Sequence, residues 1–600
     1  MVSLFAKSSF FVSTLYICLF QYLCVSSFFK TSAPFVVSTD ANINEEAEAL
    51  IKWKLSLDNQ SQHFLSSWQL EGNRSSSDCS WLGVGCDESK RITHLNLSNS
   101  GLSGTLQNLS FSSFSNLVSI DFEYNYLYGD IPLSIYSLSK LTHLNLGDNR
   151  LTGFLSPAVA NLSSLSYLNL SQNWLSGTIP REIGLMTGLS DVFIDTNLIS
   201  GTIPKEIGNM KSLRMLALDD NTNLTGSIPS SIGNLTNLVG FSLSGTKIFG
   251  NIPTEIGKLS NLRQLTLDCN NLSGALPSLG NLTSLTVVSL AYNQLNGSLP
   301  STMNNLTRLT NFQLAYNNFI GQLPDQICGG GLLMYFSAIE NHFTGPIPTS
   351  LKNCSSIIRL RLEGNQLTGN LTEAFGVHPN LYYINLSGNK LEGEVSPKWG
   401  QCPNLTSLNI SNNNLSGSIP PALGKGPQLH VLDLSLNYLT GNIPEELGSL
   451  KLLLKLMLSE NQLSGEIPHI IRMLPDLESL DLATNNLRGS IPKELGGCSK
   501  MIQLNLENNK FEGSIPWEMT NMNSLENLDF SSNLLTGEIP PQLAKMKRLE
   551  TLNLSHNNLS GFIPSEFDEM KSLTMVDISF NQLEGPIPNS KAFWAKKSTY

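Results

Sequence analysis

The sequence has little charge and lacks the motifs by which enzymes commonly bind phosphate or metal. Its 37 basic and 48 acidic side chains give a net charge of −11, whereas a general nucleic-acid-binding protein is expected to be basic. It contains no Gly-rich loop with its lysine, no HRD or DFG, no HExxH and no C-x-x-C pair. The triple glycine at 329–331 lacks the Lys-Ser/Thr of a phosphate loop. We therefore expect no catalytic residue, metal, cofactor, small-molecule substrate or nucleic-acid partner.

Long apolar runs are also missing, except at the N-terminus. Lys7 precedes the strongly apolar residues 10–29, and Lys30 follows them before a small and polar stretch. This order predicts a secretory signal peptide over residues 1–35, with an uncleaved signal anchor as the alternative. The chain is therefore expected to enter the secretory pathway and an oxidising compartment.

Sequons for N-glycosylation are dense, with about twenty Asn-x-Ser/Thr triplets along the chain. Some of these triplets arise from the repeat motif, since the common strand sequence LNLS itself contains a sequon. The density still predicts a glycosylated extracellular surface. The predicted sites include Asn73, Asn161, Asn223, Asn234, Asn281, Asn305 and Asn404.

The most abundant feature of the sequence is one repeated motif. The stretch LNLSHNNLSGFIPSEF at 552–567 is preceded by LDFSSNLLTGEIPPQL and followed by VDISFNQLEGPIPNSK, each at a distance of 24 residues. When the chain is aligned on the asparagine of this motif, from Asn125 to Asn581, it gives 21 repeats. Ser100 and Thr246 occupy the asparagine position in two weaker units. The pattern L-x-x-L-x-L-x-x-N-x-L-x-G-x-I-P is the leucine-rich repeat signature.

Each letter of the repeat has a physical role. Alternate leucines of L-x-L point to the same side of a strand and bury together. The asparagine suits a chain reversal, where its amide can bond backbone groups that have no ladder partner. Because one repeat cannot bury its leucines alone, the copies must stack. We therefore predict an α/β repeat fold, a solenoid of about 21 repeats with a parallel β-sheet on its concave side.

A cap is expected before the first repeat. Residues 45–57 predict an amphipathic helix, and SSW and CSWLGVGC follow, with Cys79 and Cys86. These features resemble the N-terminal cap of plant extracellular leucine-rich repeat proteins, whose paired cysteines form a disulfide. The resemblance implies a Cys79–Cys86 bond. The expected domains are a signal peptide (1–35), a cap (40–91), the solenoid (92–589) and a short tail (590–600).

The remaining cysteines are expected to be mostly structural. Cys354, Cys402 and Cys498 stand eleven residues before a repeat asparagine, where neighbouring units carry leucine, so buried thiols are favoured. Cys328 lies one unit before Cys354, and a Cys328–Cys354 bridge between adjacent coils stays open as the alternative. Cys269 lies at a face position and is expected to be free.

Repeats in the middle of the chain differ from the others in the sequence of their predicted strands. Outside this region strands often read LNLS or LDLS, but between Asp191 and Gly364 they read VFIDT, LALDD, VSLAY, FQLAY and LRLEG. Aromatic side chains flanked by charges on a rigid face predict a peptide-binding track, with structural noise in weaker repeats as the alternative. The predicted ligand-binding residues are Asp195, Asp219, Asp268, Tyr292, Tyr316, Arg359 and Arg361.

The arginine pair at the end of this region has two interpretations. Arg359 and Arg361 flank Leu360, so both are expected to face the concave surface. Such an R-x-R pair resembles the one by which several plant peptide-hormone receptors hold a terminal carboxylate, a task suited to the planar guanidinium. The alternative is a solvated pair neutralised by Glu363.

The repeats and cap together resemble the ectodomain of a plant leucine-rich repeat receptor-like kinase, and residues 344–370 are similar to the MDIS-interacting receptor kinase type. The resemblance implies perception of a secreted peptide at the plasma membrane, in immunity or development, with a co-receptor kinase ectodomain joining near the C-terminal repeats. The family usually closes with a second cysteine pair, which is missing after Cys498. A fragment of a receptor and a truncated form secreted to the apoplast both fit. A secreted inhibitor resembling polygalacturonase-inhibiting proteins is the runner-up.

Overall fold

The computed structural model describes residues 41–70, 78–589 and 591–594. The predicted signal peptide, Asn73 and most of the predicted tail lie outside the described residues. The chain divides into two units, 1–45 and 46–600, and the features below belong to the second unit, apart from the first residues of helix α2. None of the described helices is long and apolar enough to cross a membrane.

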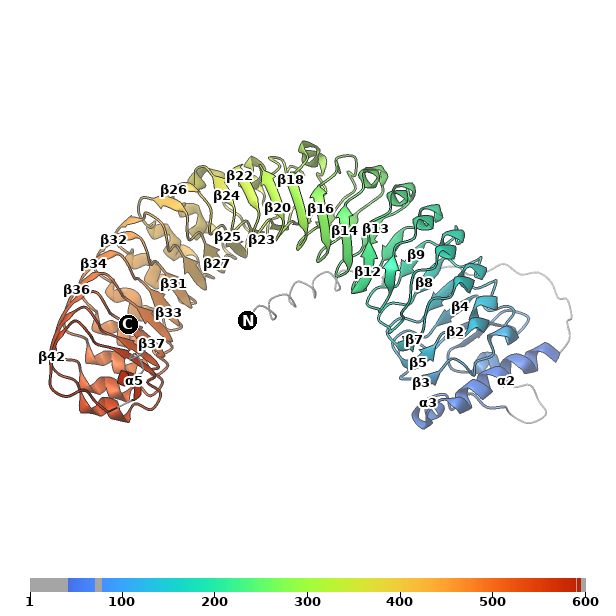
Figure 1. Cartoon of the computed structure of the whole chain (residues 1–600), viewed down its shortest axis with the longest axis horizontal. Coiled ribbons are helices and arrows are strands. Elements are labelled where there is room, and N and C mark those ends of the chain that lie inside the picture. Colours follow the sequence, from blue (N-terminus) through green and yellow to red (C-terminus); the bar gives the residue numbers. More distant parts are fainter. Residues whose placement is uncertain (1–40, 71–77, 590, 595–600) are drawn as a thin grey trace. The chain divides into compact units, whose positions relative to one another are not determined.

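The strands of successive repeats form one 22-stranded sheet on the concave side of the second unit (Figure 1). Strand β1 pairs antiparallel with β2, and each later strand pairs in parallel with that of the preceding repeat, as Arg359 does with Tyr383. One parallel strand per repeat confirms the predicted solenoid. Its strands are β1 (Val84–Cys86), β2 (Ile92–Asn96), β4 (Ser119–Asp121), β6 (His143–Asn145), β8 (Tyr167–Asn169), β9 (Asp191–Phe193), β11 (Met215–Ala217), β13 (Gly240–Ser242), β15 (Gln264–Thr266), β17 (Val287–Ser289), β19 (Asn311–Gln313), β21 (Tyr335–Ser337), β23 (Arg359–Arg361), β25 (Tyr383–Asn385), β27 (Ser407–Asn409), β29 (Val431–Asp433), β31 (Lys455–Met457), β33 (Ser479–Asp481), β35 (Gln503–Asn505), β37 (Asn527–Asp529), β39 (Thr551–Asn553) and β41 (Met575–Asp577).

A second strand follows the repeat asparagine in most coils, and these strands form shorter parallel sheets of eight, seven, three and two strands among the described residues. They are β3 (Ser103–Thr105), β5 (Tyr126–Asp130), β7 (Arg150–Thr152), β10 (Ser200–Thr202), β12 (Asn223–Gly226), β14 (Lys247–Asn251), β16 (Asn271–Ala275), β18 (Gln294–Ser298), β20 (Asn318–Gly321), β22 (His342–Pro346), β24 (Gln366–Thr368), β26 (Glu392–Glu394), β28 (Asn414–Ser416), β30 (Thr440–Gly441), β32 (Gln462–Gly465), β34 (Asn486–Ser490), β36 (Lys510–Gly513), β38 (Leu534–Gly537), β40 (Asn558–Phe562) and β42 (Gln582–Glu584).

In most coils, the segment that leads back to the next concave strand contains a short 3₁₀-helix, which begins after the Ile-Pro pair. Pro132, for example, holds an extended backbone (φ −67°, ψ 139°) immediately before η4, the conformation that proline favours. The 3₁₀-helices are η2 (Asp78–Ser80), η3 (Phe111–Ser113), η4 (Leu133–Ser137), η5 (Pro157–Asn161), η6 (Arg181–Leu185), η7 (Lys205–Asn209), η8 (Ser230–Asn234), η9 (Thr254–Lys258), η10 (Ser301–Asn305), η11 (Thr349–Asn353), η12 (Pro397–Gln401), η13 (Pro421–Lys425), η14 (Glu445–Ser449), η15 (His469–Met473), η16 (Lys493–Gly497), η17 (Trp517–Asn521), η18 (Pro541–Lys545) and η19 (Ser565–Glu569).

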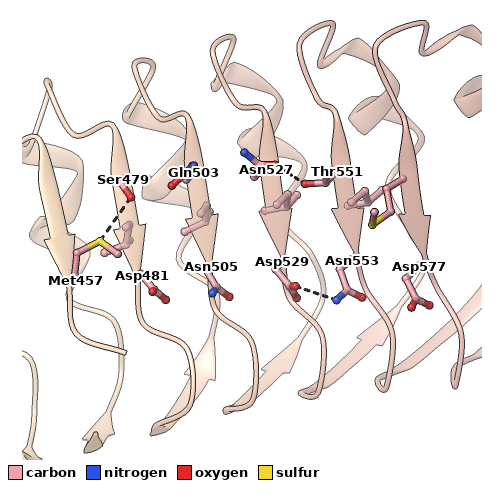
Figure 2. Close-up of a pocket in the computed structure, with 15 residues that line it drawn as sticks. Met457, Ser479, Asp481, Gln503, Asn505, Asn527, Asp529, Thr551, Asn553 and Asp577 are labelled. Carbon is pink, nitrogen blue, oxygen red and sulfur yellow. Dashed lines mark hydrogen bonds between the residues drawn. The ribbon is translucent and has the colours of Figure 1, made fainter. Parts of the chain in front are cut away.

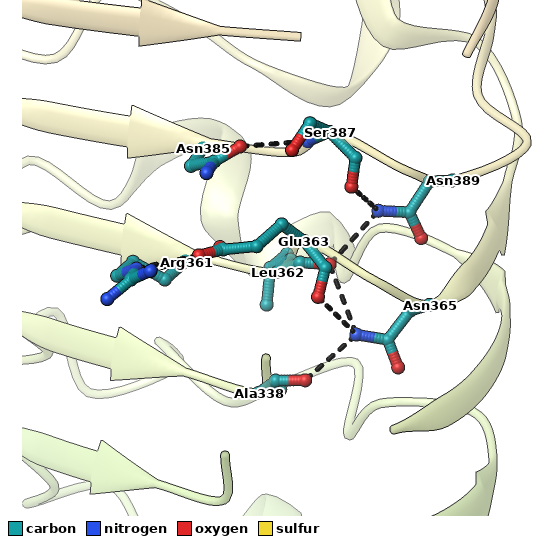
Figure 3. Close-up of polar contacts among 8 residues, drawn as sticks. All are labelled: Ala338, Arg361, Leu362, Glu363, Asn365, Asn385, Ser387 and Asn389. Atoms are coloured by element: carbon teal, nitrogen blue, oxygen red, sulfur yellow. Dashed lines mark hydrogen bonds and ion pairs between the residues drawn. The ribbon is translucent and has the colours of Figure 1, made fainter. Parts of the chain in front are cut away.

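The repeat asparagines connect neighbouring coils through their buried amides. Asn365 Nδ2 donates to the carbonyl oxygens of Leu362 (3.1 Å) and Glu363 (3.3 Å) in its own coil and of Ala338 (2.8 Å) in the preceding coil (Figure 3). Its Oδ1 accepts from the backbone N–H of Phe343 at 3.0 Å. One side chain therefore satisfies backbone groups of two coils, which is the role predicted for it.

The cap closes the N-terminal end of the core. Helix α2 (Ala41–Ser56) starts four residues earlier than predicted and ends one residue earlier, because Asp58 already caps α3 (Asn59–Phe64) by accepting from Ser61 N–H. Trp53 and Trp68 are buried against each other. The wholly buried Glu46 accepts from Arg91 Nε (3.1 Å) and from the N–H of Ile92 (2.9 Å), so its charge is compensated. Among the described residues, the other α-helices are α4 (Leu371–Ala374) and α5 (Lys591–Trp594), and the latter packs against β41.

Two disulfides are present among the described cysteines. Cys79 is bonded to Cys86, and Cys328 is bonded to Cys354. The buried-thiol interpretation is therefore wrong for Cys354, because stacking of adjacent coils brings the two Cα atoms within 6.0 Å of each other. Cys402 and Cys498 are buried free thiols, and Cys269 is a half-buried free thiol.

Candidate ligand-binding face

Side chains on the concave face are arranged in columns that run from coil to coil. We define the inner face by the residues six, four, two and one positions before each repeat asparagine. In the coil of Asn365 these are Arg359, Arg361, Glu363 and Gly364. Because the strands pair in register, residues of one column lie side by side along the stack, and a change of chemistry along a column marks a region of the face.

The C-terminal coils show the common pattern. Asp529, four positions before its asparagine, accepts from the N–H (2.9 Å) and the hydroxyl (2.6 Å) of Ser531 in the same coil. Asn553 Nδ2 donates to the other Asp529 oxygen at 2.9 Å. Asp529 and Asn553 line a groove of about 350 Å³ (Figure 2). Each of its acids, Asp481, Asp529 and Asp577, accepts from the backbone N–H of the residue two positions further along the chain.

The middle coils reverse this pattern. Here Asp219 and Asp268 stand two positions before the asparagine of their own coil, and a serine stands four positions before the repeat position of the next coil. Asp268 accepts from the hydroxyl of Ser289 and, at 3.0 Å, from the N–H of Ala291, both in the next coil. It also accepts from Ser244 Oγ at 3.2 Å. Asp219 likewise accepts from Ser242 Oγ (2.5 Å) and Ser244 N–H (2.6 Å) of the following coil.

These acids lie half-buried, and burial changes their protonation. It raises the pKa of Asp195 to about 7, with the neighbouring Asp219 charge adding to the effect. It raises the pKa of Asp219 to about 6, although the bonds from Ser242 and Ser244 oppose the rise. The pKa of Asp268 is also raised by burial and opposed by its hydrogen bonds. At a mildly acidic pH this end of the face therefore carries less negative charge than its composition suggests.

A small apolar area follows the acidic coils. Tyr292 and Tyr316 are exposed and stacked, with ring centroids 4.6 Å apart and planes 17° from parallel. Beside them Ala291, Ala315 and Ile339 form a buried cluster separate from the main core. Aromatic rings held in a fixed stack offer a rigid contact surface at little entropic cost.

The arginine pair lies next along the face. Arg361 donates from Nε (2.8 Å) and Nη2 to Glu363 Oε1 in the same coil (Figure 3). Arg359 is exposed, and its guanidinium carbon lies 4.8 Å from the ring centroid of Tyr383 on the next coil. The sequence-based alternative of neutralisation by Glu363 thus describes Arg361, while Arg359 forms no ion pair within the described residues.

The predicted residues occupy one continuous stretch of the inner face, over the coils of Asn197 to Asn365. The three predicted acids are half-buried and not fully exposed, because the next coil covers them. These acids are Asp195, Asp219 and Asp268. Sequence reasoning missed Tyr383, although counting one repeat onward from Arg359 would have found it. It also missed the serines that bond the acids, whose signal is the exchange of serine and acid between two columns. No group of three His, Cys, Asp or Glu side chains in the described ranges could hold a metal ion.

Family models match most of the repeat region. The model described as "Leucine-rich repeat region" matches residues 216–441, and "Leucine rich repeat" models match 140–162, 164–186, 476–498 and 523–583. The "Leucine rich repeat N-terminal domain" matches 43–87. The plant peptide hormone receptor RGFR1, solved in complex with RGF2, is 31% identical with a TM-score of 0.75, covering 84% of this chain and 92% of that chain.

The chain belongs to the leucine-rich repeat family of plant receptor-kinase ectodomains. A second receptor ectodomain, the Arabidopsis receptor kinase HAESA in complex with the peptide hormone IDA and the co-receptor SERK1, is 32% identical with a TM-score of 0.72, covering 89% of this chain and 98% of that chain. MDIS1-interacting receptor like kinase 2 of Arabidopsis thaliana is 44% identical over 101 residues. That stretch spans 17% of this leucine-rich repeat chain and 9% of the relative.

Proposed function

We propose that the inner face between Asp191 and Gly364 binds a secreted peptide in an extended conformation. The chain would then be the peptide-perceiving region of a plant cell-surface receptor kinase or receptor-like protein, acting outside the plasma membrane in immunity or development. One observation carries the proposal, namely the order of chemistry along this stretch. Half-buried acids come first, a tyrosine stack and an apolar cluster follow, and arginines come last.

The dimensions of this stretch suit a short peptide. Seven steps separate the coil of Asn197 from that of Asn365, and at about 4.8 Å per step they span on the order of 34 Å. An extended chain of about ten residues covers the same length. The proposed peptide therefore places its terminal carboxylate at the arginine pair and a basic or hydroxyl-bearing residue near Asp195 and Asp219.

The similar proteins support the proposal at the level of partner class. RGFR1 was solved with RGF2, and HAESA with the peptide hormone IDA and the co-receptor SERK1. By analogy, a co-receptor kinase ectodomain would join this chain near the C-terminal repeats once the peptide is bound. The polar groove lined by Asp481, Asp529 and Asp577 lies on those repeats (Figure 2).

The test uses a synthetic peptide library because the natural peptide is unidentified. Twelve-residue peptides with a free carboxyl terminus are selected on the purified, secreted glycoprotein, and the enriched peptides are resynthesised for calorimetry. Arg359→Gln and Asp195→Asn/Asp219→Asn variants are expected to weaken binding by about tenfold each, since each loses a charged contact.

The matched control changes the same chemistry in the C-terminal groove. Asp481→Asn/Asp529→Asn removes two inner-face carboxylates outside the proposed track, and affinity should stay at the wild-type value. Unchanged affinity in both of the middle variants, with the fold intact by circular dichroism, would place the ligand elsewhere on the molecule. Loss of binding in the control alone would place it in the groove.

A further inference from the structure

The two arginines of β23 differ in what already holds them. Arg361 directs two N–H groups at one oxygen of Glu363, and its side chain is about one-third exposed (32%). Its charge is therefore largely compensated before any ligand arrives. A second carboxylate would have to share its donors with Glu363 or displace Glu363 altogether.

Glu363 cannot easily give up this partner. Only 8% of the residue is exposed, and its second oxygen, Oε2, is buried without a hydrogen-bond partner among the described residues. Burial raises the pKa of Glu363, while Arg361 and, more weakly, Arg359 oppose the rise. A carboxylate held this way loses its main compensation if Arg361 turns to a ligand, so the ion pair resists being broken.

Arg359 is held by stacking alone. Its guanidinium lies over Tyr383, at 4.8 Å from the ring centroid, whereas that of Arg361 is 5.9 Å from the same ring. Stacking on an aromatic face fixes the plane of a guanidinium and leaves its N–H groups at the edge for hydrogen bonds. Arg359 is thus oriented and exposed, and it forms no direct ion pair in the described part of the chain.

We infer that the arginine pair is asymmetric: Arg359, oriented by Tyr383, binds the terminal carboxylate of the peptide, and Glu363 withholds Arg361 from it. This inference rests on the proposed function and adds which side chain makes the contact and which one limits its strength. Glu363 is then a specificity-determining residue, because removing its charge releases a second arginine to the ligand.

The binding arm compares acid and amide forms of one selected peptide. In wild type the acid form should bind more tightly. Arg359→Gln should lower the affinity for the acid form by about tenfold and remove its advantage over the amide. The double variant Arg361→Gln/Glu363→Gln should change the affinity by less than about threefold, and Glu363→Gln alone should raise the affinity for the acid form by about threefold or more. The double variant is used because Arg361→Gln alone leaves a buried carboxylate uncompensated. Lys455→Gln is the matched control, since it removes one charge from the same column in a C-terminal coil.

The chemical arm needs no peptide. Phenylglyoxal modification followed by peptide mass mapping should label Arg359 faster than Arg361 in wild type, and Glu363→Gln should raise the rate at Arg361. Equal labelling in wild type, or an equal affinity loss in Arg359→Gln and in the double variant, would overturn the asymmetry and leave the proposed function standing. Equal binding of acid and amide forms to wild type, or no enrichment from the library, would overturn the proposed carboxylate contact and this inference with it.

Discussion

The C-terminal coils and the middle coils share one backbone and one asparagine ladder, but they bond their acids differently. Asp529 accepts from Ser531, two residues further along the same coil. Asp268 accepts from Ser289 and Ala291 of the next coil. Moving the acid by two positions thus turns a bond within one coil into a link between two coils. The comparison teaches that a repeat protein can change its surface chemistry without changing the scaffold beneath it.

This difference has a consequence for ligand binding. Most bonds to the C-terminal acid Asp529 come from its own coil and, among the described residues, only Asn553 reaches it from the next coil. Acids bonded across coils bury themselves and fix the spacing of neighbouring side chains. A surface fixed in this way is suited to reading the order of groups along an extended peptide.

The largest expected effect, the loss of stability caused by a charge in the core, should be the same in both regions. Leu554 and Leu290 occupy the same buried position in a C-terminal and a middle coil, and both have 0% exposure. Leu554→Asp and Leu290→Asp each place an unpaired charge in the core, and each should lower the free energy of unfolding by about 4 kcal/mol or more. Urea denaturation measures the loss. A severe loss at one position and tolerance at the other would show that the scaffold differs after all.

A moderate effect should separate the regions. Asp268→Ala removes the acceptor of three groups in the coils on either side, whereas Asp529→Ala removes bonds made mostly within one coil. We expect a loss of about 2 kcal/mol for Asp268→Ala and of about 1 kcal/mol or less for Asp529→Ala. Denaturant melts of the two variants measure the difference. If Asp529→Ala were the more costly, the link between coils would not be the stronger arrangement.

The last expected effect is a pH dependence of stability. Asp195 and Asp219 have raised pKa values in the folded protein, about 7 and about 6, so the folded state binds more protons than the unfolded state between about pH 4 and pH 7. Stability should therefore fall as pH rises through that window. Differential scanning calorimetry should give a higher Tm at pH 5 than at pH 7.5.

The control for this pH effect is a pair of variants. Asp195→Asn/Asp219→Asn should flatten the change in Tm between the two pH values, and Ser531→Ala, in a C-terminal coil, should keep the wild-type change. A steeper pH dependence in the double Asn variant would contradict the assignment of the titrating groups.

The scaffold could be predicted from sequence because its rules are periodic. An apolar residue stands at the position of Leu554 in each repeat, and asparagine stands at the position of Asn557 in most of them. Their burial therefore follows from position alone. The bonds of Asp268 could not be predicted in this way, because their partners lie 21 and 23 residues away in a neighbouring coil and depend on how two coils stack. The repeat asparagines predict that neighbouring coils are adjacent, but not which oxygen meets which hydroxyl.

The arginine pair illustrates the same limit. Its position on the inner face follows from the alternation around Leu360. Which arginine is engaged depends on side-chain direction, since Glu363 is two residues from Arg361 and four from Arg359. Both pairings are compatible with the sequence. Burial of Glu363 beside Arg361 decides between them, and burial is a property of the packed coils.

Photo-cross-linking at two matched glutamines tests the central claim most directly. Gln264 and Gln503 occupy the same inner-face column, one in a middle coil and one in the C-terminal groove. Each is replaced in turn by a photoreactive phenylalanine derivative, and the secreted protein is irradiated with the selected acid-terminated peptide. The account predicts a strong adduct at position 264 and little at position 503. An equal yield at both positions, or a stronger adduct at position 503, would contradict it.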